Sequence, residues 1–168
     1  MSAQIGLFAQ PSVPPSRVTL WSMWQPFAGL VAAGLKTLET RMFPWPVAAR
    51  PYPSTLLICS TARADTEALK RFEAGIPPGL RDDTSLWLDS AALALVDVTG
   101  CRPLMGHDYA RSWYWDPEGD EREHPGKTRY AWTLGNLRRV RPFAVAGGQG
   151  FSRSMTAAEV EQLGGARP

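Results

Sequence analysis

Apolar side chains in this chain gather in short runs, separated by connections rich in proline, glycine and charge. Runs typical of β-strands lie at 17–22, 54–60, 91–102, 130–134 and 140–145. The third run is apolar on both faces as far as Val96, which suits a strand in a barrel or in a sheet covered on both sides. Gly100 then predicts a bulge or a sharp bend in that strand.

Helical periodicity is confined to short stretches. Phe27, Leu30 and Val31 recur at i, i+3 and i+4, which predicts a buried helix face. Pro26 fits the first turn of this helix, and Gly34 fits its C-terminal end. Two more short helices are expected, at 65–74 and 156–163. No strand–helix–strand alternation is visible, so the pattern predicts an α+β domain with a small, mostly antiparallel β-barrel and two or three short helices.

Two long connections show no regular period. The stretch 42–53 holds four prolines around Trp45, which predicts an irregular loop. The stretch 103–129 is also expected to be mostly irregular, and connections of this length are often functional. Its Trp113 and Trp115 fit either a lid over a site or packing of the loop against the barrel, and packing is favoured.

The composition is that of one globular domain with little net charge. The chain has 168 residues, 44% of them hydrophobic, and a net charge of +2, which does not by itself predict nucleic-acid binding. An acidic block at 116–123 is followed by a basic run, Arg138, Arg139 and Arg141, which suits either a nucleic-acid backbone contact or a solvated face. We expect a flexible arm at 1–16, one domain at 17–152 and a tail with a short helix at 153–168.

Several kinds of site have no support in the sequence. Cys59 and Cys101 lie in strand-like runs without a histidine or cysteine at metal-ligand spacing. His107 and His124 lack a third ligand at recognisable spacing, so we expect no metal, and no cofactor motif is present. Neither a secretory signal nor a membrane-spanning apolar run is visible, so we expect a cytoplasmic protein without membrane contact.

A charged motif follows the first predicted helix, at 34–41. Lys36, Glu39 and Arg41 place a cation, an anion and a second cation within six residues. If the stretch 38–41 is extended, Glu39 and Arg41 share one face of the strand. Such a cluster is either a solvated turn or the floor of a site.

The motif has the form G-x-K-x-x-E-x-R, and with it the chain resembles the ASCH domain, a branch of the PUA-like superfamily. The residues that carry the spacing are Gly34, Lys36, Glu39 and Arg41. Further blocks support the resemblance in the same order along the chain, at 20–28, 56–63, 94–101, 130–134 and 148–151. The resemblance spans most of the chain and implies a PUA-like β-barrel with a cleft beside the motif.

The resemblance also implies a partner class: RNA, another single-stranded nucleic acid, or a nucleoside with a modified base. In that reading Lys36 and Arg41 would meet a phosphate, and Glu39 would accept a hydrogen bond from a base edge. The alternatives are an exposed lysine at a helix end and a purely structural Glu39–Arg41 ion pair.

Three residues outside the motif complete the predicted binding set. Trp24 and Trp45 would offer stacking surfaces, Trp45 as a cleft wall, although core packing is slightly favoured for Trp24. Arg63 stands where relatives tend to carry a basic residue and would contact a phosphate. Trp21 and Trp132 fit strand interiors and are expected in the core.

The resemblance leaves an enzymatic alternative open. Some small family members resemble amidohydrolases that remove the acetyl group of N4-acetylcytidine, and others are ribonucleases or nucleic-acid binders. The amidohydrolases carry a threonine three positions after the lysine, where this chain has Glu39. If the protein is an enzyme, Lys36, Glu39 and Thr37 are the candidate catalytic residues, with Thr40 a weaker one. Binding is favoured over hydrolysis.

Overall fold

A mixed sheet forms the body of the protein. The structure, a computed structural model, describes residues 17–114, 117–146 and 150–164, so the expected arm 1–16 lies outside the described residues. Its strands are β1 (Arg17–Gln25), β2 (Leu38–Arg41), β3 (Ser54–Ala64), β4 (Ala91–Pro103), β5 (Tyr130–Ala144) and β6 (Ser154–Thr156). They lie in the order β2-β5-β4-β3-β1-β6. β1 and β3 are parallel and the other neighbours antiparallel, so the α+β class and the mostly antiparallel sheet are confirmed.

The sheet is open within the described residues, so the prediction of a closed β-barrel is wrong there. β6 pairs with the start of β1, and β2 forms the opposite edge. Farther along β1, side chains meet β2 where a barrel would have a hydrogen-bonded ladder. Trp21 Nε1 lies 3.5 Å from Glu39 Oε1, and the Arg41 guanidinium carbon lies 4.6 Å from the centre of the Trp21 ring. These side chains hold β1 and β2 face to face without backbone pairing.

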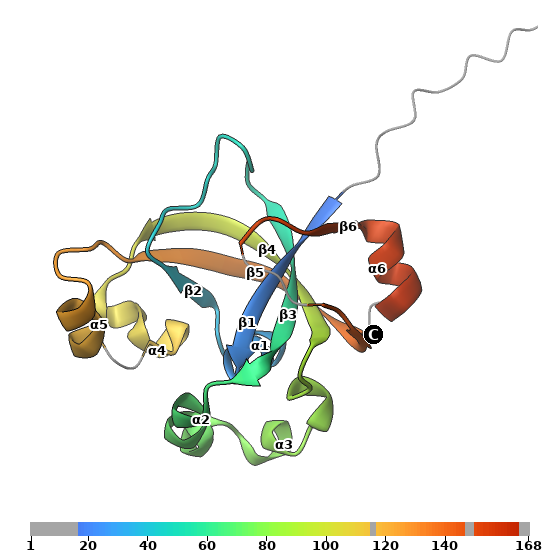
Figure 1. Cartoon of the computed structure of the whole chain (residues 1–168), viewed down its shortest axis with the longest axis horizontal. Helices are drawn as coiled ribbons and strands as arrows, with labels where there is room; N and C mark the ends of the chain where they lie inside the picture. The colour runs from blue at the N-terminus through green and yellow to red at the C-terminus, as the bar shows by residue number, and fades with distance from the viewer. Residues whose placement is uncertain (1–16, 115–116, 147–149, 165–168) are drawn as a thin grey trace, which may run out of the picture.

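Helices are more numerous and shorter than expected. Besides three single 3₁₀ turns, the described helices are α1 (Phe27–Ala32), α2 (Thr66–Phe72), α3 (Pro78–Arg81), α4 (Tyr109–Ser112), α5 (Pro117–Glu123) and α6 (Ala157–Gly164). The predictions of α1, α2 and α6 are confirmed, whereas α4 and α5 lie in the stretch expected to be irregular. Figure 1 shows α4 and α5 together at one end of the long strands β4 and β5, with α6 at the other end. No helix of the described residues is long and apolar enough to cross a membrane.

The turn after α1 explains how the chain enters the charged motif. Gly34 has a positive φ of 76°, a conformation that glycine adopts without steric cost. Its N–H bonds to the Val31 carbonyl, and the Leu35 N–H bonds to the Leu30 carbonyl, which together form a Schellman motif. The prediction that Gly34 ends the helix is confirmed. This reversal leads the chain at once into Lys36 and β2.

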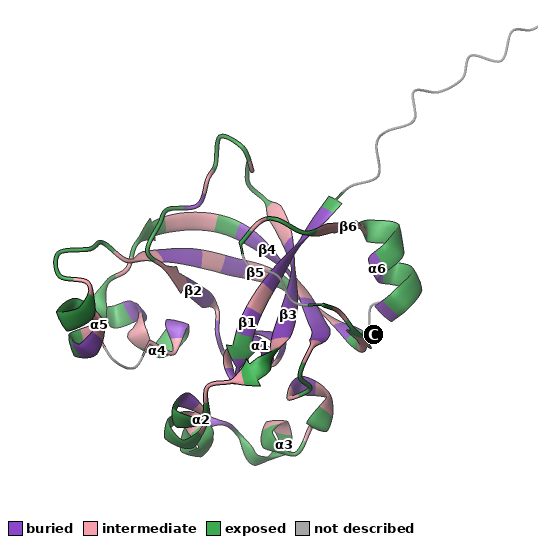
Figure 2. Cartoon of the chain, viewed as in Figure 1, coloured by how far each residue is buried: buried purple, intermediate pink, exposed green. Residues whose placement is uncertain are grey.

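Aromatic rings fill the main core between the sheet and α1. Trp132 is fully buried on β5, and the rings of Trp21 and Trp45 lie 5.0 and 4.8 Å from it. Figure 2 shows the buried positions concentrated on the central strands and the exposed ones on the outer helices. A second buried cluster lies on the other face of the sheet and includes Val160 of α6 together with Leu57 and Ala92. β4 is thus buried on both faces, as its apolar run predicts.

Candidate functional site

A cleft of about 680 Å³ lies beside the charged motif. One side comes from β1 and β2, and the other from α4, α5 and the segments that join them to the sheet. Lys36, Glu39 and Arg41 all line it, so the motif lies against a cleft and is not a solvated turn. This volume falls within the range of about 300–1,000 Å³ that is usual for small-molecule sites.

Lys36 is buried in the cleft wall with every ammonium proton engaged. Its Nζ donates to the Leu38 carbonyl at 2.9 Å and to the Ser112 carbonyl at 2.5 Å, and it lies 3.3 Å from Glu39 Oε2. Burial lowers the pKa of Lys36, and the Glu39 carboxylate offsets part of that decrease. The three acceptors hold the side chain in place, so Lys36 ties β2 to α4.

Glu39 is held between two cations. Arg41 Nη2 lies 2.5 Å from Glu39 Oε1, while Lys36 faces the other carboxylate oxygen. Burial raises the pKa of Glu39, but Arg41 and Lys36 outweigh burial and hold that pKa below its usual value. The site therefore holds a carboxylate of fixed position in its floor.

Arg41 is the most exposed of the three charged residues in the motif. Its side chain is 31% exposed, lies over the Trp21 ring and pairs with Glu39 through one nitrogen. Its Nε is buried and has no hydrogen-bond partner among the described residues. The guanidinium thus keeps donor capacity for a ligand in the cleft.

A second polar cluster lines the facing wall and was missed from the sequence. Arg129 donates through Nε and Nη2 to the two carboxylate oxygens of Asp120, and the Tyr114 hydroxyl donates to the same carboxylate. Burial raises the pKa of Asp120, but the bonds from Arg129 and Tyr114 outweigh burial and lower it overall. Burial raises the pKa of Tyr114, and the nearby Asp120 raises it further. The acidic block gave the one sequence signal for this wall, since Asp120 and Glu123 both belong to it.

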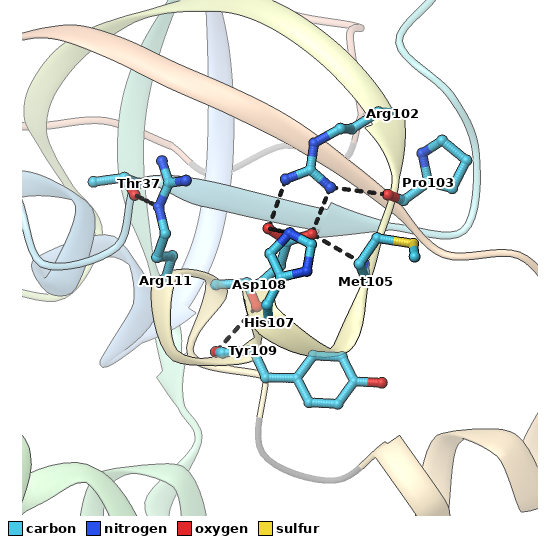
Figure 3. A network of polar contacts seen from close by, with 9 residues as sticks. Thr37, Arg102, Pro103, Met105, His107, Asp108, Tyr109 and Arg111 are labelled. Atoms are coloured by element: carbon cyan, nitrogen blue, oxygen red, sulfur yellow. Dashed lines mark hydrogen bonds and ion pairs between the residues drawn. The ribbon is translucent and has the colours of Figure 1, made fainter.

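The segment before α4 is fixed by a buried carboxylate, as Figure 3 shows. Asp108 accepts two hydrogen bonds of 2.6 Å from Arg102 and one of 3.0 Å from the Met105 N–H. The hydrogen bonds from Arg102 lower the pKa of Asp108 to about 2. His107 contacts the same carboxylate at 3.5 Å and is otherwise exposed. This network sets the start of α4 and thereby the position of Ser112 at its end.

The positions of Trp24 and Trp45 are the reverse of those expected. Trp24, favoured for the core, is 45% exposed and lines the cleft, with the Arg63 guanidinium 5.0 Å from its ring centre. Trp45, expected as a cleft wall, is 3% exposed and is absent from the described cleft lining. Its ring packs against Trp132 and Phe151 in the core. Trp21 and Trp132 are buried as predicted.

The two threonines differ in position. Thr37 faces α4, where its hydroxyl accepts from Arg111 at 3.2 Å, and it is absent from the described cleft lining (Figure 3). Thr40 lines the cleft, and its hydroxyl is buried without a hydrogen-bond partner among the described residues. Thr40 is therefore better placed than Thr37 to meet a ligand.

The basic run lies outside the described cleft lining. Arg138 and Arg139 pair with the carboxylates of Asp97 and Asp83 at 3.0 and 2.9 Å. Trp113 lines the cleft, while Trp115 lies outside the described residues. Within the described part of the chain, no three histidine, cysteine or acidic side chains gather closely enough to hold a metal ion.

The comparisons with known proteins return likeness in structure alone. No protein-family model and no curated protein matches the chain. Crystal structures of ASCH from Zymomonas mobilis do match it. These solved neighbours of the chain are ASCH domain proteins. One of these ASCH structures has a TM-score of 0.49 and 16% sequence identity, covering 86% of this chain and 90% of that chain.

Two mutant proteins of the same Zymomonas ASCH give similar values. One has a TM-score of 0.48 and 15% identity, covering 89% of this chain and 94% of that chain. The other has a TM-score of 0.48 and 14% identity, covering 86% and 92%. The ASCH name is the one that the G-x-K-x-x-E-x-R motif indicated. An overlap of this extent says nothing of the residues in the cleft.

Proposed function

We propose that the protein binds RNA or another single-stranded nucleic acid and holds one unstacked base, or a free modified nucleoside, in the cleft. The observation that carries the proposal is the pairing of exposed rings with a fixed polar floor in one cleft. Trp24 and Phe43 are 45% and 43% exposed and line the cleft with Glu39 and Arg41. A splayed base needs this combination, because its face stacks on an aromatic ring and its edge needs placed donors and acceptors.

Each residue has a role in this proposal. Trp24 stacks on a base, and the Glu39 carboxylate accepts from an amino or imino group of that base. Arg41 donates to an oxygen of the ligand. Arg63, stacked on Trp24 and exposed, meets a backbone phosphate outside the cleft.

The charge of the cleft favours a confined ligand over a broad electrostatic surface. The lining holds equal numbers of cationic and acidic side chains: Lys36, Arg41, Arg129, Glu39, Asp120 and Glu123. Because affinity from phosphate neutralisation falls with salt, a cleft of balanced charge predicts a shallow salt dependence. A confined cleft also predicts discrimination against duplexes, because the bases of a duplex stay stacked and cannot enter it.

Fluorescence anisotropy with labelled single-stranded and duplex RNA of the same sequence tests the proposal. We expect the single strand to bind more tightly, with loss of binding in Arg41→Met. Arg138→Met is the matched control, because Arg138 is also ion-paired but lies outside the described lining. If no single-stranded nucleic acid or modified nucleoside binds, the proposal fails.

A second candidate function is hydrolysis of N4-acetylcytidine or a related acylated nucleoside. The unpartnered hydroxyl of Thr40, a residue of the cleft lining, favours it, because a nucleophilic hydroxyl must not be held in a structural hydrogen bond. The engagement of all three Lys36 protons counts against it, since Lys36 then has no lone pair to act as a base. Release of cytidine by the wild type, abolished in Thr40→Val, would establish hydrolysis, and its absence would leave the binding proposal alone.

A further inference from the structure

Unsatisfied hydrogen-bonding capacity is concentrated in the cleft. Among the described residues, three buried side-chain nitrogen or oxygen atoms lack a hydrogen-bond partner: Thr40 Oγ1, Arg41 Nε and Arg129 Nη1. All three residues line the cleft beside the charged motif. Buried polar groups in folded proteins are nearly always paired, so an unpaired group calls for a partner that the protein does not supply. Two of these atoms are guanidinium nitrogens, which can only donate.

Asp120 places Arg129 so that one nitrogen stays free. The carboxylate takes the Nε and Nη2 edge of the guanidinium in a two-bond fork, and Nη1 remains. The Tyr114 hydroxyl donates to Asp120 Oδ2, the oxygen that also accepts from Arg129 Nε. This arrangement fixes the guanidinium plane before any ligand arrives.

Strand pairing brings the two arginines to the same end of β2. Arg41 is the partner of Tyr130 in the β2–β5 ladder, and Arg129 directly precedes Tyr130. Each arginine uses part of its guanidinium on one acidic side chain, Glu39 or Asp120. Both retain donors in the same cleft, so a single acceptor-rich group can receive hydrogen bonds from the two.

The formal charges indicate what that group carries. Lys36 and Arg41 surround the single Glu39 carboxylate, so these three side chains carry one excess positive charge when Lys36 is protonated, which Glu123 elsewhere in the lining balances over the cleft as a whole. The charge of Arg129 is balanced by Asp120. A phosphodiester brings one negative charge and two free oxygens, which matches the local positive charge around Arg41 and the donors of two guanidinium groups.

We propose that Arg41 and Arg129 together bind a phosphodiester of the ligand, so that the cleft takes a nucleotide within a strand in preference to a free nucleoside. The Thr40 hydroxyl donates to the same group. This inference rests on the proposed function and narrows its ligand class. Asp120 is a positioning residue that acts through Arg129.

The test compares ligands that differ in one charge. Isothermal titration calorimetry measures binding of ApA, CpC, GpG and UpU, of their uncharged methylphosphonate analogues, and of the matching nucleosides. We expect at least one dinucleotide to bind wild-type protein about tenfold more tightly than its analogue, since charge-assisted hydrogen bonds are roughly twice as strong as neutral ones. Arg129→Lys retains the charge but loses the fork, and we expect it to remove most of that difference.

Controls separate this inference from the proposed function. Arg138→Met is expected to keep the difference between the two ligands. If Arg129→Lys fails to fold, the comparison of dinucleotide and analogue on wild-type protein still decides whether the phosphodiester is contacted. Equal binding of dinucleotide and analogue overturns the phosphodiester contact while the binding proposal stands, and a difference that persists in Arg129→Lys overturns the role of Arg129. If no nucleoside, dinucleotide or single strand binds, both proposals fall.

Discussion

The ammonium of Lys36 donates a hydrogen bond of 2.5 Å to the main-chain oxygen of Ser112. The two residues belong to different walls, since Lys36 precedes β2 and Ser112 ends α4. The same ammonium contacts Glu39 in the floor. One buried lysine therefore connects the charged motif to α4 in the facing wall of the cleft.

Replacing Lys36 by methionine is expected to lower the free energy of unfolding by about 3–5 kcal/mol, the range for breaking a buried ion pair by removing one partner. The variant leaves Glu39 with Arg41 as its one remaining cation and deprives the Leu38 and Ser112 carbonyls of a donor. Urea unfolding followed by circular dichroism measures the change.

Lys70→Met is the matched control for that variant, because Lys70 is exposed on α2. We expect its unfolding free energy to stay within about 0.5 kcal/mol of the wild type. Similar small losses in both variants would contradict a bridging role for Lys36.

Local spacing was enough to predict the conformation of the charged motif and of the turn that precedes it. Gly34 follows a short amphipathic helix, and the alternation of an extended strand places Glu39 and Arg41 on one face. The structure confirms both, through the positive φ of Gly34 and the 2.5 Å contact between Glu39 and Arg41. These features depend on neighbours within a few residues, which is the range over which sequence patterns are informative.

The rest of the site depends on contacts between distant segments. Trp24 and Trp45 are the same residue type, and only the packing of Trp45 on Trp132 separates core from cleft. Asp120 and Arg129 lie in a stretch without periodicity, and their pairing becomes visible only when α5 is placed against the sheet. Whether the sheet closes is likewise decided by how side chains fill the space between its edges.

Gly34→Ala is expected to destabilise the protein by about 1 kcal/mol, because a Cβ disfavours the positive φ that the turn requires. Gly79 offers a control of opposite sign, since it lies in α3 with no atom within 4 Å of an added Cβ. Gly79→Ala is expected to stabilise the protein by up to about 1 kcal/mol. Thermal unfolding measures both changes, and equal effects of the two substitutions would refute this explanation of the turn.

The two tryptophans make a paired test of core against cleft. Trp24→Ala is expected to weaken binding of single-stranded RNA by ~1–3 kcal/mol, the usual loss for one stacked base. Its unfolding free energy should change little, because the ring is 45% exposed. Trp45→Ala should cost about 3–5 kcal/mol of stability, because it leaves a cavity in the core. Anisotropy and urea unfolding on both variants check the pair, and comparable stability losses would contradict the assignment.

The acid dependence of stability tests the clamped carboxylate. Arg41 and Lys36 hold the pKa of Glu39 below its unfolded value of about 4.5 despite burial, so the unfolded chain takes up this proton first as pH falls. The stabilisation is fully present above about pH 5 and is lost as pH falls through the folded-state pKa. Glu39→Gln is therefore expected to be less stable than wild type at neutral pH, with a shallower loss of stability below pH 5. Urea unfolding between about pH 3 and 7 measures this slope.

Asp108→Asn serves as the comparison, because it removes a different carboxyl group of lowered pKa and leaves Glu39 in place. If the wild-type and Glu39→Gln curves run parallel through the acid range, Glu39 does not titrate as a clamped carboxylate.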